Sequence, residues 1–339
     1  MDVRRDPDFR LKDLSRQLSG DKDNVLLRTR YHHALRRLRP ELDLSILSDL
    51  DAWDQASKED QDLAVAFCAE KLPGFDCVTV ETYHCEGLQH RIATFRHKTS
   101  SLDFQLIPGG RFLMGQKDGE DRDALAFYKL WEHFNPSSEQ PLHPVRVEKP
   151  FLLARFPLTE ATVPGSNSEL KDSLPLEDLS WSQAQRLLNR IQRGFTLPSE
   201  AQWEFACRGQ TMSSPQRLFF WGDDLNRDYI WFQSNSDFKR HPQRDHEQAS
   251  NAFGLIDMLG NVREWCADYF HSDYQGAPKT ERPQGHSSGQ RIRVMRGGAW
   301  NSDAGECRCA SRDFRFRRYR QNGAGVRPLW PLDKITQHI

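Results

Sequence analysis

The segment 254–265, GLIDMLGNVREW, constrains the fold of this chain more than any other stretch of it. Apolar residues lead into a Gly260-Asn261 turn, and the polar Glu264 and the large Trp265 follow it. Glycine adopts positive φ without steric cost, and asparagine tolerates the same region while it bonds locally. A Gly-Asn turn between apolar runs therefore predicts a tight connection inside a core. An alternative stays open, because Asn261 and Glu264 carry oxygen ligands of the kind that calcium binds.

Composition excludes several classes of protein. The chain has 47 Lys and Arg against 48 Asp and Glu, and this net charge of -1 creates no overall field that attracts nucleic acid or an anionic membrane. Its 20 Phe and 9 Trp provide apolar volume for a core. No apolar run approaches the roughly 18 residues that a membrane-spanning helix requires. We therefore expect no membrane partner, and the charge balance disfavours nucleic acid.

Cysteine usage and the start of the chain bear on location. The seven cysteines are an odd number and lack the spacing of a metal site. The first residues contain arginine but no apolar stretch, so they are not predicted to be a secretory signal. These features predict reduced, mostly buried thiols and a cytoplasmic protein.

Hydrophobic periodicity divides the chain into three segments. Residues 1–75 are predicted to be helical, because their apolar side chains recur at helical spacing. Residues 76–103 alternate apolar and polar side chains, and we interpret them as a strand-rich linker. The third segment, 104–332, combines strand patterns with two helices that begin at the N-cap residues Ser180 and Ser199.

Eight motifs of the third segment occur in a fixed order. They are GGRFLMG (109–115), EQPLHPVRVEKPF (139–151), LPLEDLSWSQAQRLLNRI (174–191), FTLPSEAQWEFACRG (195–209), FFWGD (219–223), IWFQSNS (230–236), GLIDMLGNVREW (254–265) and RVMRGGAWNSDAGECRCASR (293–312). This series resembles the formylglycine-generating enzyme family, also called the sulfatase-modifying factor family. The resemblance implies an α+β chain with a C-type-lectin-like fold: a small twisted antiparallel sheet, two helices and long irregular segments. It also implies structural calcium near the Gly-Asn turn, at Asn261 and Glu264.

The catalytic pattern of that family is interrupted in this chain. Its active members resemble copper-dependent oxidases, in which two cysteines separated by four residues bind Cu(I), a metal that prefers soft thiolates. Placed on this sequence, the second cysteine is Cys307, whereas the first position holds Ser302. Copper is therefore disfavoured, and an oxidase that acts on a cysteine peptide would have to use Cys307 and Cys309. The family also usually has tryptophan where this chain has Arg263.

A second alternative is an iron enzyme. One branch of the family resembles iron-dependent sulfoxide synthases, whose N-terminal helical domain contributes to a three-histidine iron site. The candidates in this chain do not match the spacing of that site, although three imidazoles can converge from distant positions; they are His32, His33, His84, His90 and His97.

The preferred interpretation is a protein that binds a ligand or another protein without catalysis. The segment 300–323 is rich in aromatic and arginine residues, which dominate binding hot spots. Its predicted ligand-binding residues are Trp300, Ser302, Asp303, Asp313, Phe314, Phe316, Arg318, Tyr319 and Gln321. The layout resembles the variable proteins of diversity-generating retroelements. An ordinary non-catalytic family member with a fixed arginine-rich tail remains an equal alternative.

Overall fold

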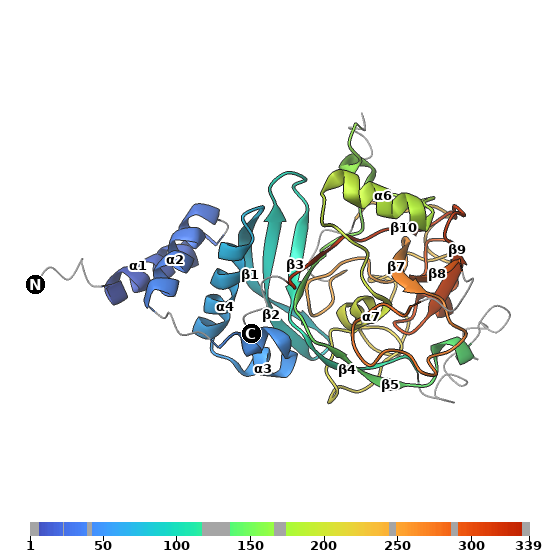
Figure 1. Cartoon of the computed structure of the whole chain (residues 1–339), viewed down its shortest axis with the longest axis horizontal. Helices are drawn as coiled ribbons and strands as arrows, with labels where there is room; N and C mark the ends of the chain where they lie inside the picture. Colours follow the sequence, from blue (N-terminus) through green and yellow to red (C-terminus); the bar gives the residue numbers. More distant parts are fainter. Residues whose placement is uncertain are drawn as a thin grey trace, which may run out of the picture.

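The structure, a computed structural model of the chain, describes residues 7–22, 24–38, 43–116, 136–165, 174–243, 249–285 and 291–333. Figure 1 shows a group of helices on one side, a sheet in the middle, and a larger part with much irregular chain on the other side. The predicted α+β class is confirmed. Among the helices in these ranges, none has the length and apolarity to cross a membrane.

The N-terminal part is helical, as predicted. Its helices are α1 (Pro7–Gly20), α2 (Val25–Leu38), α3 (Leu50–Gln55) and α4 (Lys58–Lys71), with a 3-10 turn η2 (Leu44–Ser48) between α2 and α3. Asp49 and Ser57 cap α3 and α4 through their side chains. A small apolar cluster holds α1, α2 and α4 together; it contains Leu14, Leu18, Tyr31, Leu35 and Leu63.

The central sheet joins the predicted linker to the third segment. Its five antiparallel strands lie in the order β1 (Phe75–Cys85), β2 (Leu88–His97), β3 (Asp103–Ile107), β6 (Phe151–Ala154) and β11 (Leu329–Pro331). Residues 76–103 thus form two strands of a sheet that the end of the described chain completes. A separate ribbon pairs β4 (Gly110–Met114) with β5 (His143–Val147). The three-segment division stays a prediction.

The remaining part of the chain holds two helices and a second sheet. The helices are α6 (Trp181–Ile191) and α7 (Glu200–Arg208), which begin with capping boxes at Ser180 and Ser199, as predicted. The sheet has the order β10 (Ala324–Gly325), β7 (Arg263–Tyr269), β8 (Ile292–Arg296) and β9 (Arg312–Phe316). Short 3-10 turns lie at η3 (Pro136–Glu139), η4 (Glu160–Thr162) and η6 (Ala304–Cys307). β9 is an edge strand, because it pairs with β8 alone in this sheet.

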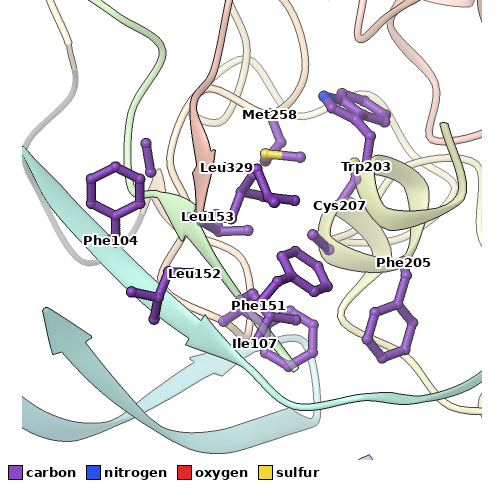
Figure 2. Close-up of a cluster of buried hydrophobic side chains, with 14 of the residues drawn as sticks. Phe104, Ile107, Phe151, Leu152, Leu153, Trp203, Phe205, Cys207, Met258 and Leu329 are labelled. Atoms are coloured by element: carbon purple, nitrogen blue, oxygen red, sulfur yellow. The ribbon is translucent and has the colours of Figure 1, made fainter. Parts of the chain in front are cut away.

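The main apolar core lies between the central sheet and α7. Figure 2 shows Phe151 and Leu153 of β6, Leu329 of β11, and Trp203 and Phe205 of α7 gathered in it. These side chains are almost fully buried, with exposed fractions of 1% or less. Burial of such large side chains is the main favourable contribution to folding, at about 1.5–3 kcal/mol for each of them.

Buried ion pairs hold the irregular chain against this core. Arg327 donates to both oxygens of Glu264, with Nη2–Oε1 at 2.8 Å, and both residues are fully buried. The same guanidinium also donates to the backbone carbonyls of Ala154, Arg155, Ile256 and Asp257. Buried backbone carbonyls require partners, and one arginine supplies them for two segments far apart in the sequence.

Removing one member of this pair tests the role of the buried charges. We expect Glu264→Ala to lower the free energy of unfolding by about 3–5 kcal/mol, because Arg327 would remain buried without its carboxylate. The matched control is Asp76→Ala, which breaks a pair with Lys98 in which both side chains are more than 40% exposed. That change should cost less than about 1 kcal/mol. Urea denaturation of both variants measures the difference, and equal losses would contradict the explanation.

Candidate functional site

The Gly-Asn turn lies in the core, as its sequence predicts. Gly260 and Asn261 have positive φ values of 74° and 57°. A side chain on Gly260 would clash with the backbone oxygen of Trp231. The side chain of Asn261 is fully buried; its Nδ2 donates to the carbonyl of His241 at 3.0 Å, and its Oδ1 accepts from the His241 N–H at 3.0 Å.

The two residues considered for calcium are both engaged by protein groups. Glu264 accepts from Arg327 and from the indole N–H of Trp203, the latter at 2.7 Å. Asn261 uses its amide oxygen to accept from His241. An ion between them would have to replace these donors, so the donor set does not favour calcium. In the ranges that the structure describes, no group of three His, Cys, Asp or Glu residues is placed to hold a metal. Calcium binding stays a prediction.

The aromatic residues of the predicted surface face solvent. Phe314 is 41% exposed, Phe316 53% and Tyr319 65%. Phe314 stacks on Phe270 with ring centroids 4.1 Å apart, while Phe316 and Tyr319 lie 5.9 Å apart. Arg318 is exposed beside them. The patch therefore has the exposure that a binding surface requires.

Other predicted ligand residues have structural contacts. Trp300 donates through its indole N–H to Glu177 Oε2 at 2.9 Å. Asp303 is exposed and begins η6 in a capping box with Glu306. Ser302 is fully buried and accepts a hydrogen bond from Arg263 Nη2 at 2.7 Å. Trp300 and Ser302 therefore support the surface more than they project from it.

Ser302 nevertheless lines a hollow, which we name the loop pocket. Its volume is about 390 Å³, and it lies between the Gly297–Ser302 segment and β9. Its wall includes Asp313, Phe314 and Gln321, three further residues predicted from the sequence. The structure thus brings together four of the nine predicted ligand residues in one hollow.

Arg263 is one of several residues of this pocket that sequence analysis did not predict as ligand residues. It is only 4% exposed, donates to Ser302, and lies with Nε 3.4 Å from Asp313 Oδ2. Asn301 and Arg315 also line the pocket. The signal available in the sequence was the replacement of the family's usual tryptophan by a charged side chain at position 263. The resulting wall alternates positive, negative and neutral polar groups.

Of the two cysteines that the oxidase alternative used, Cys309 lies against a third cysteine. Cys309 Sγ lies 3.7 Å from Cys207 Sγ of α7, a contact that sequence analysis did not anticipate. Although burial opposes it, the hydrogen bond from Cys207 lowers the pKa of Cys309. Cys307 is fully buried, and that burial, followed by nearby Glu306, raises the pKa of its thiol. The protonated form of Cys307 is therefore favoured, whereas metal binding requires the thiolate.

Two of the candidate iron-binding histidines are bound to other groups. His90 has Nδ1 2.8 Å from Asp54 Oδ2 and Nε2 2.9 Å from the carbonyl of Gly209. His97 Nδ1 lies 2.8 Å from Ser100 Oγ. Burial lowers the pKa of His32 to about 3, so this side chain is neutral at physiological pH. The contacts of His90 and His97 are structural and do not favour an iron centre at these two residues.

Three curated relatives illustrate the range of the similarity. The chain is 30% identical over 234 residues to serine/threonine-protein kinase pkn1 of Chlamydia caviae, an alignment that covers 61% of this chain and 34% of the kinase. It is 30% identical over 149 residues to the formylglycine-generating enzyme of Streptomyces coelicolor, an alignment that covers 40% of this chain and 46% of that enzyme. It is 32% identical over 152 residues to inactive C-alpha-formylglycine-generating enzyme 2 of Mus musculus, an alignment that covers 40% of this chain and 41% of the mouse protein. The chain spans less than half the length of each of these relatives.

Solved structures share the fold. PvdO from Pseudomonas aeruginosa has a TM-score of 0.57 at 21% identity, covering 69% of this chain and 95% of PvdO. Treponema denticola variable protein 1 has a TM-score of 0.53 at 22% identity, covering 69% and 97%. The sequence profile of the sulfatase-modifying factor enzyme 1-like domain matches residues 91–331, which is most of the chain. This protein therefore belongs to the formylglycine-generating enzyme family, also named for sulfatase-modifying factor.

Proposed function

We propose that this protein is a non-catalytic binding module whose surface is formed by residues 300–323. The observation that carries the proposal is the environment of Ser302. At the position of the first copper-binding cysteine of the active relatives, this chain has a hydroxyl that accepts from Arg263. The position that holds a copper-binding thiolate in those relatives is thus part of a polar wall in this chain.

The chemistry of the loop pocket favours recognition. Arg263 and Arg315 offer donors, Asp313 offers acceptors, and Gln321 offers both. A few convergent polar groups in a small hollow fix the orientation of a ligand. Phe316 and Tyr319 stand outside the pocket and add exposed ring surface of the kind found in binding hot spots. Together, the polar pocket and the exposed rings favour as ligand a protein or a small molecule with both polar and apolar groups.

A rigid frame supports the same conclusion. β9 pairs with β8 along its whole length, from Arg312 opposite Arg296 to Phe316 opposite Ile292. Arg312 is fixed to Glu200 by two hydrogen bonds of 2.7 and 2.9 Å. Ordering of loops on binding costs free energy, and a surface that is already ordered avoids that cost.

Two relatives agree with this proposal. A mouse relative is named an inactive formylglycine-generating enzyme, so the family includes a member described as inactive. A Treponema denticola protein with the same fold is named a variable protein. We extend the proposal to a segment 300–323 that a retroelement diversifies. A near-copy of its codons in the flanking DNA, differing mainly at adenines, would support this extension, and its absence would leave a fixed binding surface.

A copper-dependent oxidase is the second candidate function, because formylglycine-generating enzymes are among the relatives and Cys307 is retained. We expect that the protein, supplied with Cu(I) and a cysteine-containing peptide, consumes no oxygen above the protein-free control. The physical reason is the single thiol at the two family positions, which cannot provide a pair of soft ligands. Oxygen uptake that follows enzyme concentration would contradict the proposal.

Alkylation tests the state of Cys307 directly. We expect iodoacetamide at neutral pH to leave Cys307 unmodified in the folded protein and to modify it fully in urea, because the thiol is buried and its pKa is raised. Peptide mass spectrometry identifies the modified residue. Rapid modification of Cys307 under native conditions would show an accessible thiolate and would argue for the oxidase.

A panned peptide library tests the binding surface. Displayed random peptides selected on the wild-type protein should lose at least about tenfold in affinity for a Phe316→Ser, Tyr319→Ser double variant, because buried aromatic anchors carry much of the binding energy. The matched control is Phe238→Ser, since Phe238 is 64% exposed but lies outside the segment. Selected peptides that bind the double variant as well as wild type, or that depend on Phe238, would refute the assigned surface.

A further inference from the structure

A second and larger hollow lies on the other flank of the same segment. It has a volume of about 670 Å³ and is formed by the first turns of α6 and the turn that follows β9. Figure 1 places α6 and β9 in the same part of the molecule. We name it the arginine hollow, because its wall contains Arg186 of α6 and Arg317, Arg318 and Arg320 of the turn.

Within the part of the chain that the structure describes, most of these charges lack a counter-ion. Arg320 pairs with Asp178, with Nη2–Oδ2 at 2.6 Å. Arg186, Arg317 and Arg318 make no ion pair with any carboxylate among the residues that the structure describes. Three guanidinium groups around one hollow therefore create a local positive field, although the whole chain carries a net charge of only -1.

A further arginine lies beneath the hollow. Arg293 is held between the rings of Trp181 and Tyr269, at 3.9 and 3.4 Å from their centroids, and Trp181 lines the hollow. Burial and the nearby charge of Arg317 lower the pKa of Arg293. Repulsion between these arginines is relieved when an anion enters beside them.

The α6 wall of the hollow, which also carries Arg186, has polar groups that suit a peptide. Ser182, Gln185 and Asn189 recur along one face of α6 and line the hollow. Their hydroxyl and amide groups can pair with the N–H and C=O groups of an extended backbone. A hydrogen bond of 3.0 Å from Ser182 N to Arg317 O fixes the distance between the two walls.

A peptide could instead bind by adding a strand to the edge of β9, but the geometry disfavours this binding mode. The backbone N–H of Phe314 donates to Asp313 Oδ1 at 2.6 Å, and its carbonyl accepts from Arg315 Nη1 at 2.9 Å. Charged side chains therefore cover the backbone groups at the centre of this edge strand. A partner would be recognised by side chains in the hollow instead of by the edge.

We propose that the arginine hollow binds a carboxylate-rich, extended peptide segment of a partner protein. The proposal rests on the proposed binding function of 300–323 and adds the chemistry of its partner. Guanidinium groups bind carboxylates through paired hydrogen bonds, which are stronger than neutral ones. Proteins that bind single strands stack successive bases on several aromatic rings, whereas Trp181 is the one aromatic residue in the described lining of the hollow, and Arg293 lies over its ring.

The test uses the full chain and fluorescence anisotropy. The probe is a fluorescein-labelled synthetic peptide that alternates Glu with Ser; the same peptide with Gln for Glu and an oligothymidylate of equal charge serve as comparison ligands. We expect binding of the Glu peptide that weakens with added salt, and little binding of the Gln peptide. An Arg186→Gln, Arg318→Gln double variant should lose at least about tenfold in affinity.

A second double variant controls for net charge. Arg111→Gln and Arg146→Gln remove two exposed arginines that face each other across β4 and β5, outside the hollow. This variant should keep wild-type affinity. Equal loss in both variants, or no binding of the Glu peptide, would overturn the proposal, and tighter binding of the oligothymidylate would assign the hollow to nucleic acid instead. If panned peptides still require Phe316 and Tyr319 in any of these cases, the proposed function stands and this inference alone fails.

Discussion

The ion pair between Arg327 and Glu264 is the interaction on which the irregular half of the molecule depends. Both groups are fully buried, and removal from water is costly for each of them unless every donor and acceptor is satisfied. Arg327 meets this condition by bonding the carboxylate together with four backbone carbonyls. Arg308 and Glu139 repeat the arrangement at the loop that follows η6, with Nη2–Oε1 at 2.7 Å. Such pairs tie irregular segments to neighbouring strands, as Arg327 does between the carbonyl of Ile256, Ala154 of β6 and Glu264 of β7.

A frame of this kind accommodates a different side chain in the wall of the loop pocket without loss of the fold. Arg263 stands on β7, one residue before Glu264, and Ser302 follows the Gly297-Gly298 turn. The family resemblance implies a different side chain at both positions, yet the backbone around Glu264 is fixed by Trp203, Arg327 and the paired strands. Replacement of a thiol by a hydroxyl and of an indole by a guanidinium changes the chemistry of the pocket wall while the core remains packed. In the proposed function, Ser302 and Arg263 form part of a polar pocket wall in place of the copper ligand and the aromatic side chain that the family resemblance implies there.

Sequence analysis was most successful where the signal is local. The caps at Ser180 and Ser199 are encoded within four residues, and the Gly260-Asn261 turn within two, so each was predicted with its structural role. Contacts between distant segments were not predictable in this way. Cys309 meets Cys207 across 102 positions, and nothing beside either residue indicates the other. The alternation in residues 76–103 likewise predicted strands correctly. That these strands share a sheet with β6 and β11 depends on contacts between distant segments, which a local pattern does not encode.

In the proposed binding function, the two hollows beside β9 have different roles that follow from their charge. In the loop pocket the buried Arg263 lies beside Asp313, so its charge acts at short range and in a fixed direction. The arginine hollow is open and lacks matching carboxylates among the described residues, so its field extends into solvent. Unpaired surface charge accelerates encounter with an oppositely charged partner, whereas buried paired groups control how long and how specifically it stays. Because residues 312–321 contribute to both hollows, changes in that one short segment alter attraction and fit together, on a frame that does not have to change.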